Sequence, residues 1–388
     1  MGFTRGHGSS PTVWLALLAL VVSSVALSAC GSSKSSNSTA STGPTGHTGS
    51  AGANQAAASE RLAPYVGHPS AFPVDAALAR KPSPGSTFEF LQCATSTCGL
   101  ASEALAGAAK TLGVKFKAVK AGASASEVQN AMGSIVASHP AAFLSGGIEL
   151  SGVGSQLKQL TSQGVAVSTF GALDAAEYGV QAPINGSQAL QLDGALMAAW
   201  AVEKKGGAAN VVLYTTPELQ PSIAEKQGFD AELAKLCPGC SPREVHIPFT
   251  EYGTTAPSTI VSDLQSHPST NVAAFVTGDQ AVGLPSALKT AGLTVLTIAT
   301  GPVPANLSDI KSGGLTAGIG VDIPVMLWTC VDAAARVATG QQLTAGEKAG
   351  IPPIQLLEKA DITFDPAHGW TGYPDFVERF AKLWNGKG

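Results

Sequence analysis

Apolar strand-like segments alternate with amphipathic helix-like segments from residue 86 to residue 322. Strands that alternate with helices form parallel sheets covered by helices on both faces, so the alternation predicts an α/β fold. The strand-like segments are 86–95, 114–120, 141–147, 165–171, 179–185, 209–216, 243–250, 271–279, 293–301 and 315–322. The helix-like segments are 100–113, 124–140, 151–164, 187–206, 221–239, 256–268, 281–292 and 304–314, with Ser124 or Ser126 as the expected cap of the second.

The alternation stops near residues 169–175 and starts again at residue 179. Two complete runs of strands and helices predict two doubly wound parallel sheets, each in a lobe of its own. The body of about 300 residues that carries them is long enough for two such lobes.

The N-terminus has the pattern of an exported protein. Arg5 precedes an apolar run that ends at Leu27, and this run is too short for a comfortable membrane span. The segment Leu27-Ser28-Ala29-Cys30 looks like a bacterial lipobox, in which the cysteine is diacylated and becomes the first residue after cleavage. We therefore expect residues 1–29 to be a lipoprotein signal peptide and Cys30 to carry the lipid. The alternative is an ordinary secretory signal with an incidental cysteine.

The segment after Cys30 is rich in Ser, Thr, Gly, Ala and Asn and poor in large apolar side chains. Such a composition buries too little surface to offset the entropy of ordering, so residues 30–58 are expected to be a flexible tether. Residues 59–85 contain several prolines and some apolar side chains. We expect them to form an extended arm that lies on the folded body.

Composition and motifs exclude several classes of function. The net charge is −4 and no basic stripe is present, which argues against nucleic-acid binding. No nucleophile-elbow, zinc-protease, phosphate-loop or paired-carboxylate motif occurs in the sequence. His139 and His267 each precede a proline at an expected helix end, where they favour contacts with carbonyl groups. The sequence therefore gives little support to an enzyme, and we expect neither a cofactor nor a metal.

Three phrases in the body carry a resemblance to a known family. They are "LTSQGVAVSTFGA" (160–172), the paired units "ASHPAAFLSGG" (137–147) and "LQSHPSTNVAAFVTGDQAVGLPSALKTAGL" (264–293), and "GGLTAGIGVDIPVMLWTCVDAAARVATGQ" (313–341). Their order and spacing resemble the periplasmic type I solute-binding proteins, in the ribose-type sugar-binding branch. The match runs from about residue 86 to 365, which is most of the body.

The resemblance implies an architecture and a role. Two lobes joined by a three-strand hinge would close around a small ligand, and a membrane permease of an ABC importer would recognise the closed form. The lobes would comprise residues 86–171 with 323–353, and residues 172–322 with 354–388. We expect a monomer, anchored by its lipid to the outer face of the cytoplasmic membrane.

The resemblance places the ligand outside the carboxyl ends of the strands, as is general for open α/β sheets. Asp279 and Asp322 have an alternative role as helix caps, and Glu149 has one as a solvated charge. The residues expected to line the ligand site are Gln92, Thr95, Ser96, Thr97, Ser145, Gly146, Glu149, Thr169, Phe170, Thr215, Glu218, Thr277, Asp279, Gln280, Thr300 and Asp322.

The sequence departs from the sugar-binding pattern at four places. The Asp-Arg pair usual after the fourth strand is Phe170-Gly171, and a usual Asn is Gly278. A usual Asp aligns near Thr300, and the Arg usual before a Gly-Phe pair has no match in 223–229. We therefore expect a site that is less charged than a typical sugar site, with Phe170 available to stack on a ring. The ligand is then a sugar, or a smaller or more apolar solute.

The remaining cysteines fit an oxidising compartment. We expect Cys93 to bridge to Cys98 beside the ligand site, and Cys237 to bridge to Cys240 within "CPGC" as a structural turn. Cys330 is expected to be a buried free thiol, with pairing to Cys93 left open.

Two other functions stay open. A sensor subunit for a membrane signalling kinase would look the same in sequence. An extracytoplasmic thiol-disulfide protein would depend on the "CPGC" motif.

Overall fold

The computed structural model describes residues 48–93, 96–122 and 124–386, which belong to one compact unit. The expected signal peptide, Cys30 and the first part of the expected tether lie outside the described residues. Within the described ranges no helix is long and apolar enough to cross a membrane.

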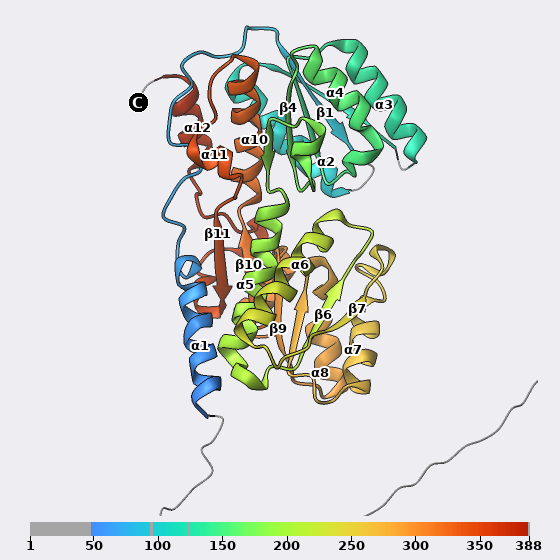
Figure 1. The fold of residues 1–388 in the computed structure, drawn as a ribbon, viewed down its shortest axis with the longest axis vertical. Helices are drawn as coiled ribbons and strands as arrows, with labels where there is room; N and C mark the ends of the chain where they lie inside the picture. The colour runs from blue at the N-terminus through green and yellow to red at the C-terminus, as the bar shows by residue number, and fades with distance from the viewer. Residues whose placement is uncertain (1–47, 94–95, 123, 387–388) are drawn as a thin grey trace, which may run out of the picture. The chain divides into compact units, whose positions relative to one another are not determined.

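The first sheet contains five parallel strands in the order β2-β1-β3-β4-β5 (Figure 1). Side chains of β1 alternate between its two faces: Phe88 and Phe90 belong to the core cluster that includes α2 and α10, whereas Leu91 belongs to the cluster that includes α3 and α4. The strands are β1 (Thr87–Gln92), β2 (Lys115–Lys120), β3 (Ala142–Gly146), β4 (Ala166–Phe170) and β5 (Ala182–Ile184). The helices are α2 (Ser96–Leu112), α3 (Ala125–Ser138), α4 (Gly154–Ser162), α10 (Ile323–Ala338), α11 (Ala345–Ala349) and α12 (Phe376–Trp384).

The second sheet contains six strands in the order β11-β10-β9-β8-β6-β7. All neighbours are parallel except β10 and β11, which are antiparallel. Helices α1, α5 and α6 cover one face, and α7, α8 and α9 cover the other. The strands are β6 (Val211–Thr215), β7 (Arg243–His246), β8 (Val272–Phe275), β9 (Leu296–Thr300), β10 (Ala317–Val321) and β11 (Ile354–Glu358). The helices are α1 (Thr48–Leu62), α5 (Ser187–Lys205), α6 (Gln220–Leu236), α7 (Ala256–Ser266), α8 (Leu284–Ala291) and α9 (Pro304–Ser312).

Two sheets of this kind confirm the predicted fold class. Ser124 caps α3 in a capping box with Glu127, as one of the two expected caps. One strand was assigned to the wrong sheet: the segment 179–185 was expected to begin the second sheet, whereas β5 pairs with β4 at the edge of the first. An edge position suits this strand because Pro183 has no N–H to donate to a further neighbour.

The chain passes between the two sheets at 185–186, 322–323 and 350–353, and these crossings are hydrogen-bonded to one another. The Asn185 amide donates to the Gly350 carbonyl (2.7 Å), and the Asp322 amide donates to the Pro353 carbonyl (2.9 Å). The second and third crossings lie at or beside the expected lobe boundaries of 322–323 and 353–354. The first lies at 185–186 instead of the expected 171–172, because β5 belongs to the first sheet.

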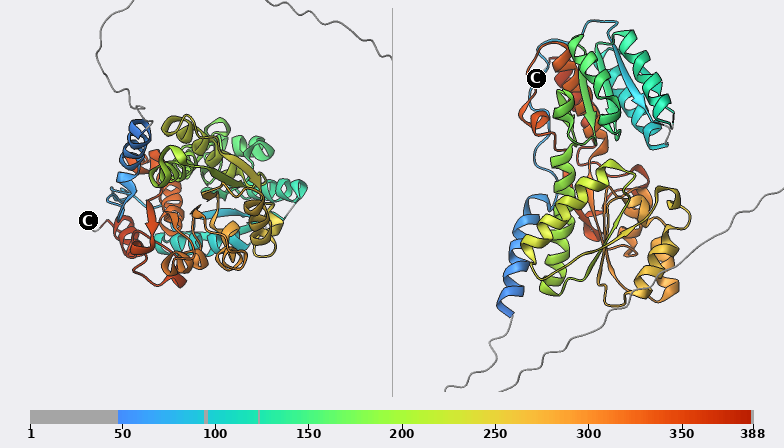
Figure 2. Two further views of the ribbon diagram at one scale, coloured as in Figure 1. Left: turned by 90° about the horizontal axis from the view of Figure 1, so that it is seen from below. Right: turned by 45° about the vertical axis from the view of Figure 1, so that its right-hand side comes forward.

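Helix α1 corrects the expectation of a tether over residues 30–58. From Thr48 onward the chain is helical, and α1 lies along α5 (Figures 1 and 2). Ala58 and Leu62 are buried in the core beneath it, and the side-chain amide of Gln55 donates to the Glu203 backbone carbonyl (2.9 Å). The Ala, Gln, Glu and Arg residues between 55 and 62 are good helix formers, and the two buried side chains supply the packing that a tether lacks.

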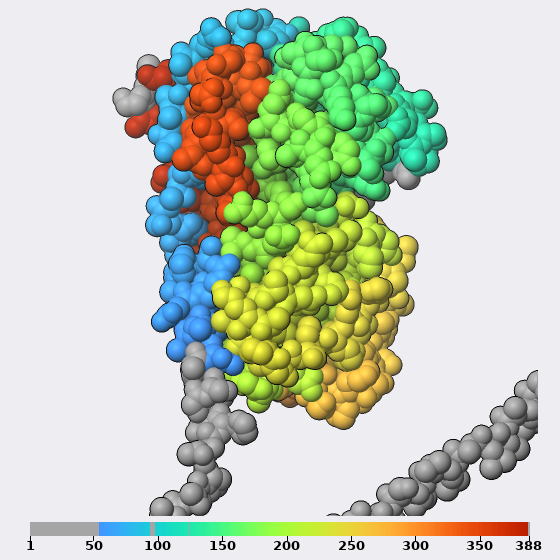
Figure 3. All heavy atoms as spheres, in the orientation of Figure 1, coloured from blue at the N-terminus to red at the C-terminus, as the bar shows by residue number. Residues whose placement is uncertain are grey.

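Residues 59–62 of the predicted arm 59–85 belong to α1, which corrects the start of the arm. After a short 3-10 turn at Ala63–Tyr65, the rest of the arm runs as irregular chain to β1. Figure 3 shows it in blue along one edge of the molecule, beside orange-red atoms of the C-terminal third of the chain. The Leu78 amide donates to the Leu383 carbonyl (3.1 Å), and the Tyr373 hydroxyl donates to the Pro69 carbonyl (3.0 Å). Helix α12 also packs here, with Phe380 and Trp384 buried against α2 and α10.

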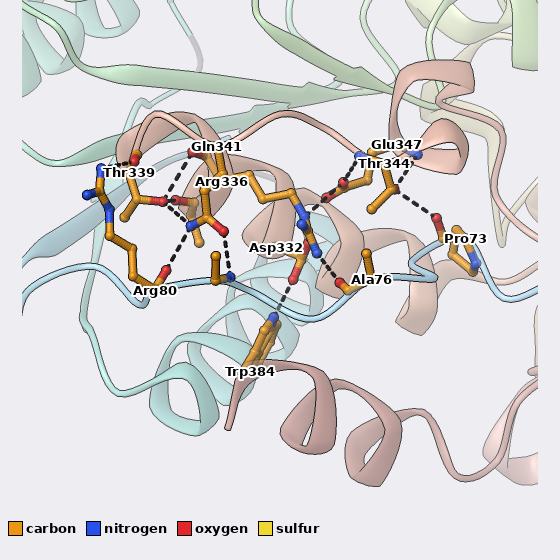
Figure 4. Close-up of polar contacts among 12 residues, drawn as sticks. Pro73, Ala76, Arg80, Asp332, Arg336, Thr339, Gln341, Thr344, Glu347 and Trp384 are labelled. Carbon is orange, nitrogen blue, oxygen red and sulfur yellow. Dashed lines mark hydrogen bonds and ion pairs between the residues drawn. The ribbon is translucent and has the colours of Figure 1, made fainter. Parts of the chain in front are cut away.

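A buried polar network fastens this arm to α10 (Figure 4). The Arg336 guanidinium lies 2.6 Å from Asp332 and 3.1 Å from Glu347, and it also donates to the Ala76 carbonyl of the arm. The Trp384 indole N–H donates to Asp332 (2.5 Å). The three charged side chains are almost fully buried. Burial and the adjacent Asp332 raise the pKa of Glu347 to about 8, because one guanidinium compensates only one of two carboxylates.

Candidate functional site

A cavity of about 470 Å³ lies at the carboxyl ends of β8, β9 and β10. Its volume falls in the range of small-molecule sites, roughly 300–1,000 Å³. Most of its lining is apolar, with a small set of polar side chains contributed by helices and loops of the second sheet and by the chain crossing at Asn185. The lining residues used below are Asn185, Asp193, Ser222, Glu225, Thr277, Asp279, Thr300, Gly320, His368 and Trp370.

Asp193 and Glu225 line this cavity from two helices in close contact. A Cβ at Gly194 would lie 1.8 Å from the Glu225 carbonyl oxygen, and a Cβ at Gly228 would lie 1.8 Å from the Gln191 carbonyl oxygen. Two glycines at the crossing therefore let the backbones of α5 and α6 touch. This close approach brings the two acidic side chains into one buried place.

Both carboxyl groups lack full hydrogen bonding. Asp193 is 1 % exposed and Glu225 is 3 % exposed, and Oδ1 of Asp193 and Oε2 of Glu225 have no hydrogen-bond partner. Burial raises the pKa of Asp193 well above its usual range. Burial and the charge of Asp193 raise the pKa of Glu225, against the opposing effect of the Thr300 hydroxyl. None of the described residues that line the cavity is Lys or Arg.

Three residues predicted from the strand ends line the same cavity. Thr277 and Asp279 follow β8, and Thr300 ends β9. The Thr277 side chain accepts from the Asp279 amide, so Thr277 is the residue that caps the short turn. Partial burial raises the pKa of Asp279. The Trp370 ring also lines the cavity, and Gly320 leaves room for it, since a Cβ there would lie 2.9 Å from the ring.

Four predicted residues of the second sheet lie outside the cavity lining. The Thr215 hydroxyl donates to Glu244 (2.9 Å), Gln280 is buried and donates to the Thr216 hydroxyl (3.0 Å), and Glu218 is exposed. Asp322 caps α10: one carboxylate oxygen accepts from the Val325 amide, and the other accepts from Thr371 and Gly372 at 2.8 Å each. Burial raises the pKa of Asp322 to about 6.

The predicted residues of the first sheet lie at the carboxyl ends of β1, β3 and β4. Ser145 and Thr169 are neighbours across β3 and β4, and their buried hydroxyl oxygens have no partner. The Phe170 ring stacks on Phe90 at 6.2 Å and covers Gly146. Gln92 is half-buried, and Glu149 is exposed and accepts from Ser151. Thr95 lies outside the described residues, and of Ser96 and Thr97 only the backbone, at the start of α2, is described.

Sequence reasoning missed Asp193, Glu225, His368 and Trp370 because none of them directly follows a parallel strand. It missed Asn185, which follows β5, because the predicted strand segment 179–185 included this residue. One signal was available for the first two. Asp193 is a lone acid in the Ala-rich segment 189–202, and Glu225 stands in the region where the expected Arg is missing. Burying an ionised side chain in a helix that is surrounded by the core costs free energy. Such a residue is therefore a candidate for a functional site.

Both predicted disulfides are present in the structure. Cys93 is bonded to Cys98, beside the start of α2, and Cys237 is bonded to Cys240 after the end of α6. Cys330 is a buried free thiol whose pKa is raised by burial. The "CPGC" motif thus follows a helix C-terminus, where the helix dipole does not favour a thiolate. Within the described ranges, no three His, Cys, Asp or Glu side chains gather as a metal site would require.

Solved structures of solute-binding proteins share this fold. A glucose-galactose binding protein from Geobacillus stearothermophilus is 16 % identical with a TM-score of 0.62, over 73 % of this chain and 100 % of that chain. A 5-methylthioribose transporter solute-binding protein from Thermotoga lettingae is 15 % identical with a TM-score of 0.63, over 78 % and 99 %. A Mycobacterium smegmatis protein in complex with β-D-fucofuranose is 16 % identical with a TM-score of 0.61, over 78 % and 98 %.

Among curated proteins, none is significantly similar in sequence to this chain. The family model for the periplasmic binding protein domain matches residues 97–342. This range is more than half of the chain, and it contains β2 to β10 together with every polar cavity residue named above except His368 and Trp370. The chain therefore belongs to the periplasmic binding protein domain family.

Proposed function

We propose that the protein is a lipid-anchored, extracytoplasmic solute-binding receptor that captures a small ligand and delivers it to an ABC importer. The observation that carries the proposal is the cavity of about 470 Å³ at the carboxyl ends of β8, β9 and β10. Its lining combines apolar walls, one tryptophan and a few polar groups, which is the composition of sites for small organic ligands. Sugars, polyols and other small hydroxyl-bearing solutes are the classes that the sugar-binding relatives suggest.

Capture in this proposal proceeds by hinge closure, with no covalent step. The hydroxyls of Ser145 and Thr169 are buried without partners at the carboxyl ends of β3 and β4. Together with Phe170 they give the first sheet polar and aromatic groups for the other side of a ligand. The three adjacent chain crossings are the segments that would bend. A shift from mainly open to mainly closed needs roughly 5 kcal/mol of preference for the closed form.

A thermal-shift screen of the full chain tests this proposal. The panel contains sugars, polyols, nucleosides, amino acids and small aromatic acids. A ligand present at about 100 times its dissociation constant adds about 2.7 kcal/mol of stability, which is a clear rise in melting temperature. Asp279→Ala should lower the affinity for the best ligand of the panel. Asp230→Ala changes a residue of α6 outside the cavity and should leave this affinity unchanged. A panel without any ligand that shifts the melting temperature would contradict the proposal.

Lipid attachment is tested separately by mass spectrometry of the protein from its native membrane. The proposal predicts an N-terminal Cys30 that carries acyl chains, and Cys30→Ala releases the protein from the membrane fraction. Two or more chains give stable anchoring because each buried methylene contributes about 0.8 kcal/mol. An unmodified Cys30 in the mature protein would show that the anchor is absent and would leave solute binding untouched.

A further inference from the structure

Among the residues that the structure describes, the buried carboxyl pair in the cavity has no cationic partner. Asp193 and Glu225 both line the cavity, both are almost fully buried, and each has one carboxylate oxygen without a hydrogen bond. Lys226, next to Glu225 in sequence, is instead paired with Asp230 and Glu244. Buried acids are normally paired with a base or fully hydrogen-bonded, so the missing partner is expected to come from outside the protein.

We propose that the ligand of this cavity carries a protonated amine that binds against Asp193 and Glu225. This inference rests on the proposed solute-binding function and narrows its ligand class to small organic cations. Asp279, in the same lining, adds a third acidic group, and Trp370 offers a ring face of the kind that attracts cations. An ammonium group has three donors, which match the unpartnered carboxylate oxygens and the Thr300 hydroxyl beside Glu225.

The carboxyl groups of Asp193 and Glu225 should differ in protonation between the ligand-free and the ligand-bound cavity. Without ligand, burial and mutual repulsion favour the protonated carboxyls, as the raised pKa values of Asp193 and Glu225 indicate. An ammonium ion that enters favours the carboxylates, so binding releases protons to the buffer and strengthens as pH rises through the raised pKa values. The other titratable groups around the pair are Asp279 and His368 in the lining, and Tyr252, on whose pKa the charges of Asp279, Glu218 and Glu225 act.

Isothermal titration calorimetry of the full chain tests the inference with matched probes. The ammonium probes are D-glucosamine, D-galactosamine and putrescine, and the neutral probes are D-glucose, D-galactose and N-acetyl-D-glucosamine. At least one amino sugar is expected to bind about 30-fold more tightly than its neutral counterpart. The neutral sugar has no ammonium group, so its complex lacks the buried ion pair with the carboxylates. Amino sugars and the sugar-free diamine distinguish a ligand with a sugar skeleton from a plain amine. Titrations in two buffers of different ionisation enthalpy should show proton release.

Isosteric variants locate the effect. Glu225→Gln and Asp193→Asn keep the shape of the cavity and should each weaken the ammonium probe about 30-fold or more. Asp230→Asn removes a carboxyl of α6 outside the cavity and should change nothing. A neutral sugar that binds as tightly as its amine, or unchanged affinity in both cavity variants, would overturn the inference while leaving the proposed function standing. Failure of all six probes would count against the inference, and failure of the wider solute panel as well would count against the function.

Discussion

At the scale of single residues, Glu347 shows how a buried acid can store a proton. Its carboxyl shares the Arg336 guanidinium with Asp332 and accepts from the Thr344 amide (2.7 Å). The raised pKa of about 8 means that the folded protein holds this proton under conditions where the unfolded chain, with a glutamate pKa of about 4.3, has released it. Folding and protonation are therefore linked at this residue.

The first prediction concerns pH and stability. Between about pH 4.3 and about pH 8, the folded state binds more protons at Glu347 than the unfolded state, so its contribution to the free energy of unfolding falls as pH rises. Glu347→Gln should remove this fall, and urea unfolding near pH 5 and pH 8 measures it. The exposed Glu103→Gln serves as the control. Equal pH slopes for the wild type and Glu347→Gln would refute the assignment.

A second prediction at this scale concerns Arg336. Arg336→Ala leaves Asp332 and Glu347 buried without a cation, so it should cost roughly 3–5 kcal/mol of stability. It also removes the donor to the Ala76 carbonyl, so protease should cut the arm between residues 66 and 86 more readily. The exposed Lys289→Ala is the control for both measurements. An arm that stays protected in the variant would show that the network does not hold it.

At the scale of elements, the crossing of α5 and α6 determines where the two acids of the cavity lie. The contact depends on Gly194 and Gly228, because a methyl group at either position would collide with a carbonyl of the facing helix. Close-packed helices have little room to adjust, so a side chain here pushes them apart.

The third prediction follows from this contact. Gly194→Ala should destabilise the protein by at least about 2 kcal/mol although alanine is the better helix former. Gly133→Ala is the matched control, since a Cβ at this position in α3 would meet nothing within 4 Å. It should stabilise by about 0.5–1 kcal/mol. Thermal and urea unfolding of both variants measure the difference, and a neutral Gly194→Ala would contradict the described crossing.

The fold was predictable from local signals, and the carboxyl pair was not. Strand and helix periods, and caps such as Ser124, are properties of neighbouring residues and define the two sheets. Asp193 and Glu225 are 32 positions apart in sequence, and their meeting depends on how α5 and α6 cross, which no local pattern encodes. The edge position of β5 and the docking of α1 on α5 likewise depend on long-range packing.

At the scale of the whole molecule, the proposed function requires that the three chain crossings bend when ligand binds. The cavity lies on the side of the second sheet, and the first sheet presents unpartnered hydroxyls at its own strand ends. A ligand that satisfies both sets of groups binds the closed form more tightly than the open form, and this difference drives closure.

Small-angle X-ray scattering of the full chain, with and without a saturating ligand, tests this central claim most directly. Calorimetry on the same sample establishes saturation. Hinge closure should give the saturated protein a smaller radius of gyration, and Glu225→Gln should show no such change at the same ligand concentration. An unchanged radius of gyration in a wild-type protein that calorimetry shows to be saturated would contradict it.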